Sequence, residues 1–131
     1  SQRLIQAARA VAALHELAFI GAPTAIERDA AIQRFEFTFE IMWKTAREYL
    51  KAMEGIDARS PKSVIRYCRD GDLLTDEQTV AALKMANDRN MTAHTYDERI
   101  AAEIFSRLPD HCRLLEHWLA AMKARMNQGG T

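Results

Sequence analysis

The chain has 131 residues, of which 48% are hydrophobic and 27% are charged. These proportions are ordinary for a globular protein and exclude intrinsic disorder, so we predict one folded domain over residues 1–131. The 18 Lys and Arg residues balance the 18 Asp and Glu residues, so a nucleic-acid role needs a local site rather than a global positive charge. The sequence has neither a signal-peptide pattern nor an apolar run of the ~18 residues that a membrane span needs, and we expect a cytoplasmic protein with no membrane partner.

The first predicted helix covers residues 2 to 20 and ends before Gly21 and Pro23. Residues at steps of three and four form its apolar face: Leu4, Ala8, Val11, His15 and Phe19. Because His15 lies on this face, we expect it to be a core histidine whose hydrogen bonds are satisfied.

The second predicted helix begins after Thr24, which can form a capping box with Glu27, and it continues to about residue 53, where Gly55 ends it. Its apolar stripe predicts a buried face, and we expect the aromatic residues there to be core rather than a base-stacking surface. The stripe consists of Ile32, Phe35, Phe39, Met42, Trp43, Ala46, Leu50 and Met53. Phe37 and Ile41 lie on another side of the helix. A helix that is apolar on two sides is either central or shared with a second subunit, so this pattern indicates a dimer.

Two further helices have clear start signals. A short third helix begins at Ser60, has Pro61 in its first position and ends by Gly71. The fourth begins after Thr75, with Gln78 as its capping-box partner, and extends to about residue 93.

The fifth predicted helix begins near Thr95, where Glu98 would complete another capping box, and continues to about residue 125. Pro109 lies within it, but an apolar row keeps its phase across the proline, which favours one kinked helix. The row is Ile100, Ile104, Leu108, Cys112, Leu115, Leu119 and Met122. We expect His111 and His117 to lie at the surface of this helix.

These elements predict an all-α fold, an up-and-down bundle of four to five helices that dimerises. Cys68 and Cys112 are far apart in the sequence and have no metal-ligand spacing. We expect both thiols to be reduced and at least partly buried.

The fourth helix carries the most informative pattern. Its stripe begins apolar and becomes polar while it stays in phase: Val80, Leu83, Asn87, Asn90 and His94. A polar side chain that points inward costs about 1–3 kcal/mol if it finds no partner. Three in succession predict a hydrated pocket, an interface or a hydrogen-bonded network.

Arg89 and His94 offer chemistry that suits cleavage of a phosphodiester. The imidazole can move the proton of a 2′-hydroxyl or of the leaving oxygen, and the guanidinium can stabilise the charge on the phosphorane. No cofactor is required, and Asp88 with His94 would be too few ligands for a metal site. Five helical residues turn through roughly 140° beyond a full circle, so the two side chains converge only if the helix ends at His94 or a second copy completes the site. The alternative is an ion-paired Arg89 on the surface and a His94 that caps or packs at the helix end.

Residues 88–97 read DRNMTAHTYD, which contains Arg, four residues, His, one residue and Tyr. The motif residues are Arg89, Asn90, His94 and Tyr96. This string resembles the signature of HEPN-domain proteins and, within them, of the HepT branch, also described as nucleotidyltransferase substrate-binding proteins. The run QRFEFTFE at 33–40, followed by Trp43-Lys44, resembles the second helix of that branch, and the Ser60-Pro61 start of a short Arg-bearing helix agrees as well.

The resemblance implies a dimeric helical bundle that holds Arg89 and His94, supported by Asn90, at the dimer cleft. It implies a metal-independent endoribonuclease that acts as a toxin on an RNA substrate such as tRNA or mRNA. The implied partner is an MNT-type nucleotidyltransferase antitoxin, which transfers AMP to Tyr96 and silences the nuclease. The added bulk and negative charge beside Arg89 would repel an RNA phosphate.

Lys62, Arg66 and Arg69 fall on one face of the third helix, where they can steer an RNA backbone toward the cleft or can form an ordinary solvated face. Two alternatives to the ribonuclease stay open. In one, the chain is a non-catalytic subunit that presents a substrate to a separate nucleotidyltransferase. In the other, it is a dimeric scaffold in which Asn87, Asn90 and His94 satisfy one another.

Overall fold

The computed structural model describes residues 2–129, and within them the regular structure is helical, without a strand. The two limits of the predicted domain, Ser1 and Thr131, lie outside the described residues. The elements in chain order are α1 (Gln2–Ala18), α2 (Ala25–Tyr49), a π-helical turn (Leu50–Glu54), α3 (Pro61–Asp70), α4 (Asp76–Met91), a 3₁₀ turn (Thr92–His94) and α5 (Glu98–Gly129).

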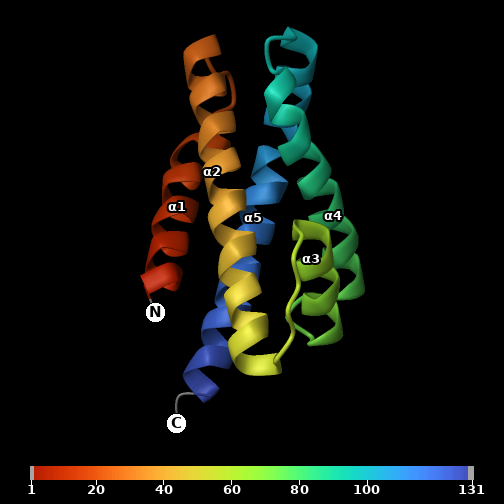
Figure 1. The fold of residues 1–131 in the computed structure, drawn as a ribbon. Helices are drawn as coiled ribbons and strands as arrows, with labels where there is room; N and C mark the ends of the chain where they lie inside the picture. Colours follow the sequence, from red (N-terminus) through yellow and green to blue (C-terminus); the bar gives the residue numbers. More distant parts are fainter. Residues whose placement is uncertain (1, 130–131) are drawn as a thin grey trace.

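The long helices run alternately up and down, which confirms the predicted all-α bundle (Figure 1). α1 and α2 pair along one side, α5 packs against both, and the short α3 lies beside the first half of α4. The 3₁₀ turn that joins α4 to α5 lies at the end of the bundle opposite the start of α1. No helix within the described part of the chain is long and apolar enough to cross a membrane.

The buried face of α1 differs from the predicted one. Its core residues are Leu4, Ala7, Val11, Leu14 and Ala18. The prediction that His15 is a core residue is wrong, because its side chain is 57% exposed and Phe19 is also exposed. Leu14 gains more than an imidazole does from burial, so the helix is rotated to bury Leu14 against α2 and α5.

α2 begins as predicted, and together with the π-helical turn it ends as predicted. The Glu27 amide donates to the Thr24 hydroxyl and the Thr24 amide donates to the Glu27 carboxylate, which confirms the capping box. After the π-helical turn, Gly55 takes a left-handed conformation with φ of 67° and ends the helical stretch. The predicted stripe is buried except at Met53, and Phe37 is 55% exposed on the other side.

The starts of α3 and α4 confirm the predicted caps, but the start of α5 does not. Both Ser60 and Thr75 accept from the backbone three residues later. The predicted Thr95–Glu98 capping box is wrong. Asp97 caps α5 instead, because its carboxylate accepts from the Arg99 amide and its carbonyl from the Ala101 amide.

α5 is one helix with Pro109 inside it, as predicted, and the row from Ile104 to Met122 is buried. Cys68 and Cys112 are both free and buried, which confirms the expectation for the thiols. His117 is exposed as expected. The prediction that His111 lies at the surface is wrong, because only 6% of it is exposed.

Candidate active site at the end of α4

Arg89 lies in the last turn of α4 and its guanidinium is held by a carboxylate from α2. Its Nε and Nη2 atoms lie 3.0 and 2.9 Å from Oε1 of Glu40. The other Glu40 oxygen accepts from the indole N–H of Trp43 at 3.2 Å. This carboxylate therefore has partners on both sides and fixes the direction of the Arg89 side chain, of which 29% is exposed.

A pocket of about 320 Å³ opens between α2, α4 and the start of α3, and it brings three predicted site residues together. Arg89, Asn90 and Lys62 all line it, together with Glu40. Two cationic side chains and the positive end of the α3 dipole outweigh the single carboxylate, so the pocket favours an anion. Its remaining lining residues are Phe39, Ser60, Pro61 and Ala86.

Arg66 and Arg69 do not line this pocket. Both are exposed on α3, and Arg69 lies 3.4 Å from the carboxylate of Asp70. The structure thus joins Lys62 to the Arg89 pocket and leaves the other two cations on the outer surface of the helix.

α4 ends before His94. This is one of the two conditions under which the side chains of Arg89 and His94 could converge. The α-helix stops at Met91, and Thr92 begins the 3₁₀ turn. The Thr92 hydroxyl lies 2.5 Å from the Glu36 carboxylate and 2.8 Å from the Arg89 carbonyl oxygen. A second carboxylate of α2 thereby anchors the turn beside the end of α4.

His94 ends this turn, Tyr96 follows it, and both are exposed; 82% of Tyr96 is accessible. Nδ1 of His94 lies 3.4 Å from the Tyr96 hydroxyl, and the two rings meet edge-on with centroids 6.0 Å apart. Neither residue lines the pocket that holds Arg89. One chain therefore separates the motif into Arg89 and Asn90, which line the pocket, and His94 and Tyr96, which lie outside it.

The polar stripe of α4 faces outward, not inward as predicted. The helix buries Thr79, Ala82, Met85, Ala86 and Asp88. Val80 is 54% exposed, and Asn87 and Asn90 are exposed with it. Alanine, methionine and the ion-paired Asp88 fill the inner face, so the predicted stripe lies on the outer face of the helix. The scaffold alternative required hydrogen bonds that join Asn87, Asn90 and His94. Among the described residues there is no such bond.

The sequence did not predict the hydrogen-bonded network that Asp88, which lies next to Arg89 in the chain, forms with Arg107 and His111. Asp88 accepts from Nε and Nη2 of Arg107 at 2.7 and 2.9 Å, and its Oδ2 atom lies 2.7 Å from Nε2 of His111. Since a carboxylate can only accept, Nε2 of His111 carries the proton. Burial acts to raise the pKa of Asp88, but the hydrogen bonds from His111 and Arg107 outweigh it and hold that pKa below its ordinary value. The spacing of Arg107 and His111, one helical turn apart on α5, was the available signal.

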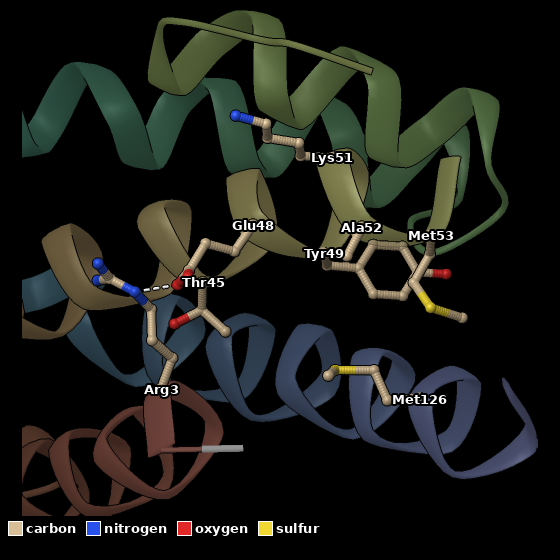
Figure 2. A pocket seen from close by; sticks show the side chains of 8 residues that line it. All are labelled: Arg3, Thr45, Glu48, Tyr49, Lys51, Ala52, Met53 and Met126. Carbon is tan, nitrogen blue, oxygen red and sulfur yellow. Dashed lines mark ion pairs between the residues drawn. The ribbon is translucent and has the colours of Figure 1, made fainter. Parts of the chain in front are cut away.

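A second hollow, of about 360 Å³, lies where the π-helical turn meets α5 (Figure 2). Arg3 and Glu48 form an ion pair at its edge, while Tyr49, Met53 and Met126 make its wall largely apolar. Its described lining includes none of the predicted site residues, so the pocket at Arg89 remains the candidate site.

Comparison with known proteins identifies the family of this fold. Residues 2–124 match the family model described as nucleotidyltransferase substrate binding protein like. The chain therefore belongs to that family, which confirms the predicted resemblance to the HepT branch of HEPN-domain proteins. A curated relative, the probable ribonuclease HepT of Haemophilus influenzae, is 30% identical over 84 residues, which cover 61% of this chain and 56% of the relative.

Solved structures with the same fold come from several bacteria. A crystal structure from Thermus thermophilus is 52% identical and has a TM-score of 0.87; the match covers 88% of this chain and 98% of that one. The substrate-binding domain of a nucleotidyltransferase from Haemophilus influenzae is 22% identical, with a TM-score of 0.77 over 92% and 98% of the two chains. A tri-AMPylated HEPN toxin from Shewanella oneidensis, solved with its MNT antitoxin, is 16% identical and also has a TM-score of 0.77, over 94% and 95%.

Proposed function

We propose that this chain is the ribonuclease toxin of a toxin–antitoxin pair and that it cleaves RNA without a metal ion. The observation that carries the proposal is the anion-favouring pocket in which Arg89, Asn90 and Lys62 meet at the start of α3. Such a pocket suits one phosphate of an RNA backbone. The curated relative named a probable ribonuclease supports the reaction class.

In the proposed reaction, the 2′-oxygen of the substrate attacks the adjacent phosphorus and the P–O5′ bond breaks. Arg89 stabilises the charge on the phosphorane, and Asn90 supports it as a neutral donor. His94 accepts the 2′-proton or supplies a proton to the leaving 5′-oxygen. Its exposed ring at the edge of the bundle is open to a polynucleotide.

A homodimer would complete the site. His94 lies outside the pocket of Arg89 within one chain, whereas a two-fold pairing of the outer face of α4 would place two copies of the motif side by side. Two imidazoles could then divide the roles of base and acid.

The proposed regulator is an MNT-type nucleotidyltransferase that transfers AMP to the Tyr96 hydroxyl. Tyr96 is 82% exposed, and its hydroxyl lies 3.4 Å from Nδ1 of His94. An attached AMP would cover His94 and, in the proposed dimer, would add negative charge near the phosphate site. The AMPylated toxin of the same fold, in complex with its MNT antitoxin, supports this assignment.

The decisive test is cleavage of a tRNA or total-RNA pool in EDTA by protein whose Tyr96 is shown by mass spectrometry to carry no AMP. We expect discrete products from the wild type, loss of cleavage in His94→Ala and Arg89→Ala, and unchanged cleavage in the control His117→Ala. His117 is also an exposed histidine but lies on α5, away from the motif.

The second candidate is a non-catalytic subunit that presents a substrate to a nucleotidyltransferase. Two observations favour it. Glu40 already binds the Arg89 guanidinium that would hold the phosphate, and the family is described as substrate binding. RNA binding without cleavage by the unmodified wild type would establish this second candidate in place of the ribonuclease.

A further inference from the structure

Three side chains that the proposed function does not use meet where α1 packs against α5. His15 comes from α1, and Cys112 and Glu116 come from adjacent turns of α5. Nδ1 of His15 lies 3.0 Å from Oε1 of Glu116. Sγ of Cys112 lies 3.3 Å from the same oxygen and 3.9 Å from Nδ1. One nitrogen, one sulfur and one oxygen thus lie within 4.8 Å of one another.

The separations of these atoms match the edges of a tetrahedral zinc site. Zinc bonds are about 2.3 Å to sulfur and about 2.0–2.1 Å to nitrogen and oxygen. Tetrahedral angles then put sulfur about 3.6 Å from nitrogen and about 3.5 Å from oxygen, and nitrogen about 3.3 Å from oxygen. The observed separations of 3.9, 3.3 and 3.0 Å each lie within about 0.4 Å of those values.

The kind and charge of the donors select the metal. An imidazole and a thiolate are poor ligands for magnesium or calcium, which prefer oxygen. Thiolate, imidazole and carboxylate together suit zinc, and the two negative charges of Cys112 and Glu116 balance its charge of two. We propose that His15, Cys112 and Glu116 form a zinc site that ties α1 to α5 and leaves the fourth position to water.

The surroundings favour a preformed site that a metal ion can enter. Cys112 is fully buried, whereas the side chains of His15 and Glu116 are 57% and 45% exposed. Phe19 packs on the His15 ring with centroids 4.7 Å apart, and the Arg113 guanidinium lies over the Phe19 ring at 5.0 Å. These contacts restrict the imidazole before any ion binds, which lowers the ordering cost.

The zinc site is separate from the proposed ribonuclease site, because none of its three ligands lines the Arg89 pocket. A structural zinc site stabilises the fold that contains it. The proposal is therefore independent of the ribonuclease, which is expected to cut RNA in EDTA.

Cobalt is the probe for this site, since Co²⁺ takes the place of zinc and reports tetrahedral thiolate ligation by its colour. Untagged, metal-stripped protein is titrated with Co²⁺ and then with zinc. We expect one cobalt per chain, a sulfur-to-cobalt charge-transfer band with strong visible d–d bands, and loss of both when zinc is added. Zinc should also raise the melting temperature of the wild type.

Matched variants decide whether these three residues are the ligands. His15→Ala and Glu116→Gln change exposed side chains, so both should fold. Loss of a residue that only orients a ligand weakens metal binding about 10–100-fold, so we expect each ligand variant to bind cobalt at least about 100-fold more weakly. His117→Ala, next to Glu116, should bind as the wild type does. A wild type without the charge-transfer band, or His15→Ala and Glu116→Gln variants with wild-type affinity, would overturn the proposal and leave a hydrogen-bonded cluster.

Discussion

Asp88 precedes Arg89 in the sequence and its buried carboxylate joins α4 to α5 through Arg107 and His111. Only 11% of the Asp88 side chain and 8% of the His111 side chain are exposed, whereas Arg107 is 47% exposed. When Asp88 is truncated, the half-exposed Arg107 can turn to water. The loss in unfolding free energy should therefore be smaller than the loss of about 3–5 kcal/mol for breaking a fully buried ion pair. We expect Asp88→Ala to lose about 1–3 kcal/mol in urea unfolding.

The same carboxylate gives the stability a defined dependence on pH. Because the folded-state pKa of Asp88 lies below its ordinary value, its contribution is complete above about pH 3.9 and is lost as pH falls through the folded-state pKa. The difference in unfolding free energy between wild type and Asp88→Ala should therefore shrink on acidification below about pH 4. A difference that stays constant down to pH 2 would mean that His111 and Arg107 do not favour the ionised form.

Single residues also show what the sequence could not reveal. The motif spacing identified Arg89, Asn90, His94 and Tyr96, but it contained no information on Glu36 and Glu40. These two carboxylates bind the motif from residues about fifty positions away along the chain. Contacts of that kind depend on how α2 and α4 are rotated against each other, which local periodicity does not determine.

At the scale of the elements, capping chemistry located the starts of α2, α3 and α4 because each cap acts within four residues. The cap of α5 was predicted wrongly because Thr95 and Glu98 have the spacing of a capping box but bind other partners. The Thr95 hydroxyl donates to the Thr92 carbonyl oxygen, and Glu98 binds Arg28 of α2 at 2.7 Å. A tertiary ion pair thus competes with the local capping box.

The observed cap of α5 can be tested by two neighbouring substitutions. Asp97→Ala removes the acceptor for the Arg99 amide and should cost about 1 kcal/mol, or about 3–5 °C in melting temperature. Thr95→Ala removes one hydrogen bond inside the 3₁₀ turn and leaves the cap of α5 intact, so its cost should be smaller. Calorimetry of both variants compares them directly, and a larger loss in Thr95→Ala would restore the capping box that the sequence suggested.

At the scale of the whole molecule, hydrophobic periodicity predicted the bundle well where a helix has one strongly apolar side, as α5 does. It failed for α1 and α4, whose competing faces differ little in apolar content. On α4 the inner face is made of alanines, a methionine and an ion-paired aspartate, while valine and leucine begin the other stripe. The choice between such faces is made by the neighbouring helices.

Exposed apolar residues make the outer face of α4 and the outer side of α2 the two candidates for a dimer interface. Val80 is 54% exposed on α4 beside the partly buried Leu83. Phe37 is 55% exposed and lines a groove of about 420 Å³ between α1 and α2. Of these two helices, α4 carries Arg89 and is followed directly by the turn that ends at His94, so pairing through α4 is the arrangement that the proposed nuclease favours.

We therefore expect the wild type to be a dimer and Val80→Glu to be a monomer in size-exclusion chromatography with light scattering. A buried carboxylate without a partner costs several kcal/mol, and two-fold symmetry places it in the interface twice. The helical circular dichroism of Val80→Glu should be unchanged, since the side chain is exposed within one chain, while RNA cleavage should be lost with the dimer. Phe37→Glu is the matched control and should stay dimeric and active. If Phe37→Glu is instead the monomer and Val80→Glu remains a dimer, the interface lies on α1 and α2, and each chain must then bind a phosphate with its own Arg89 and His94.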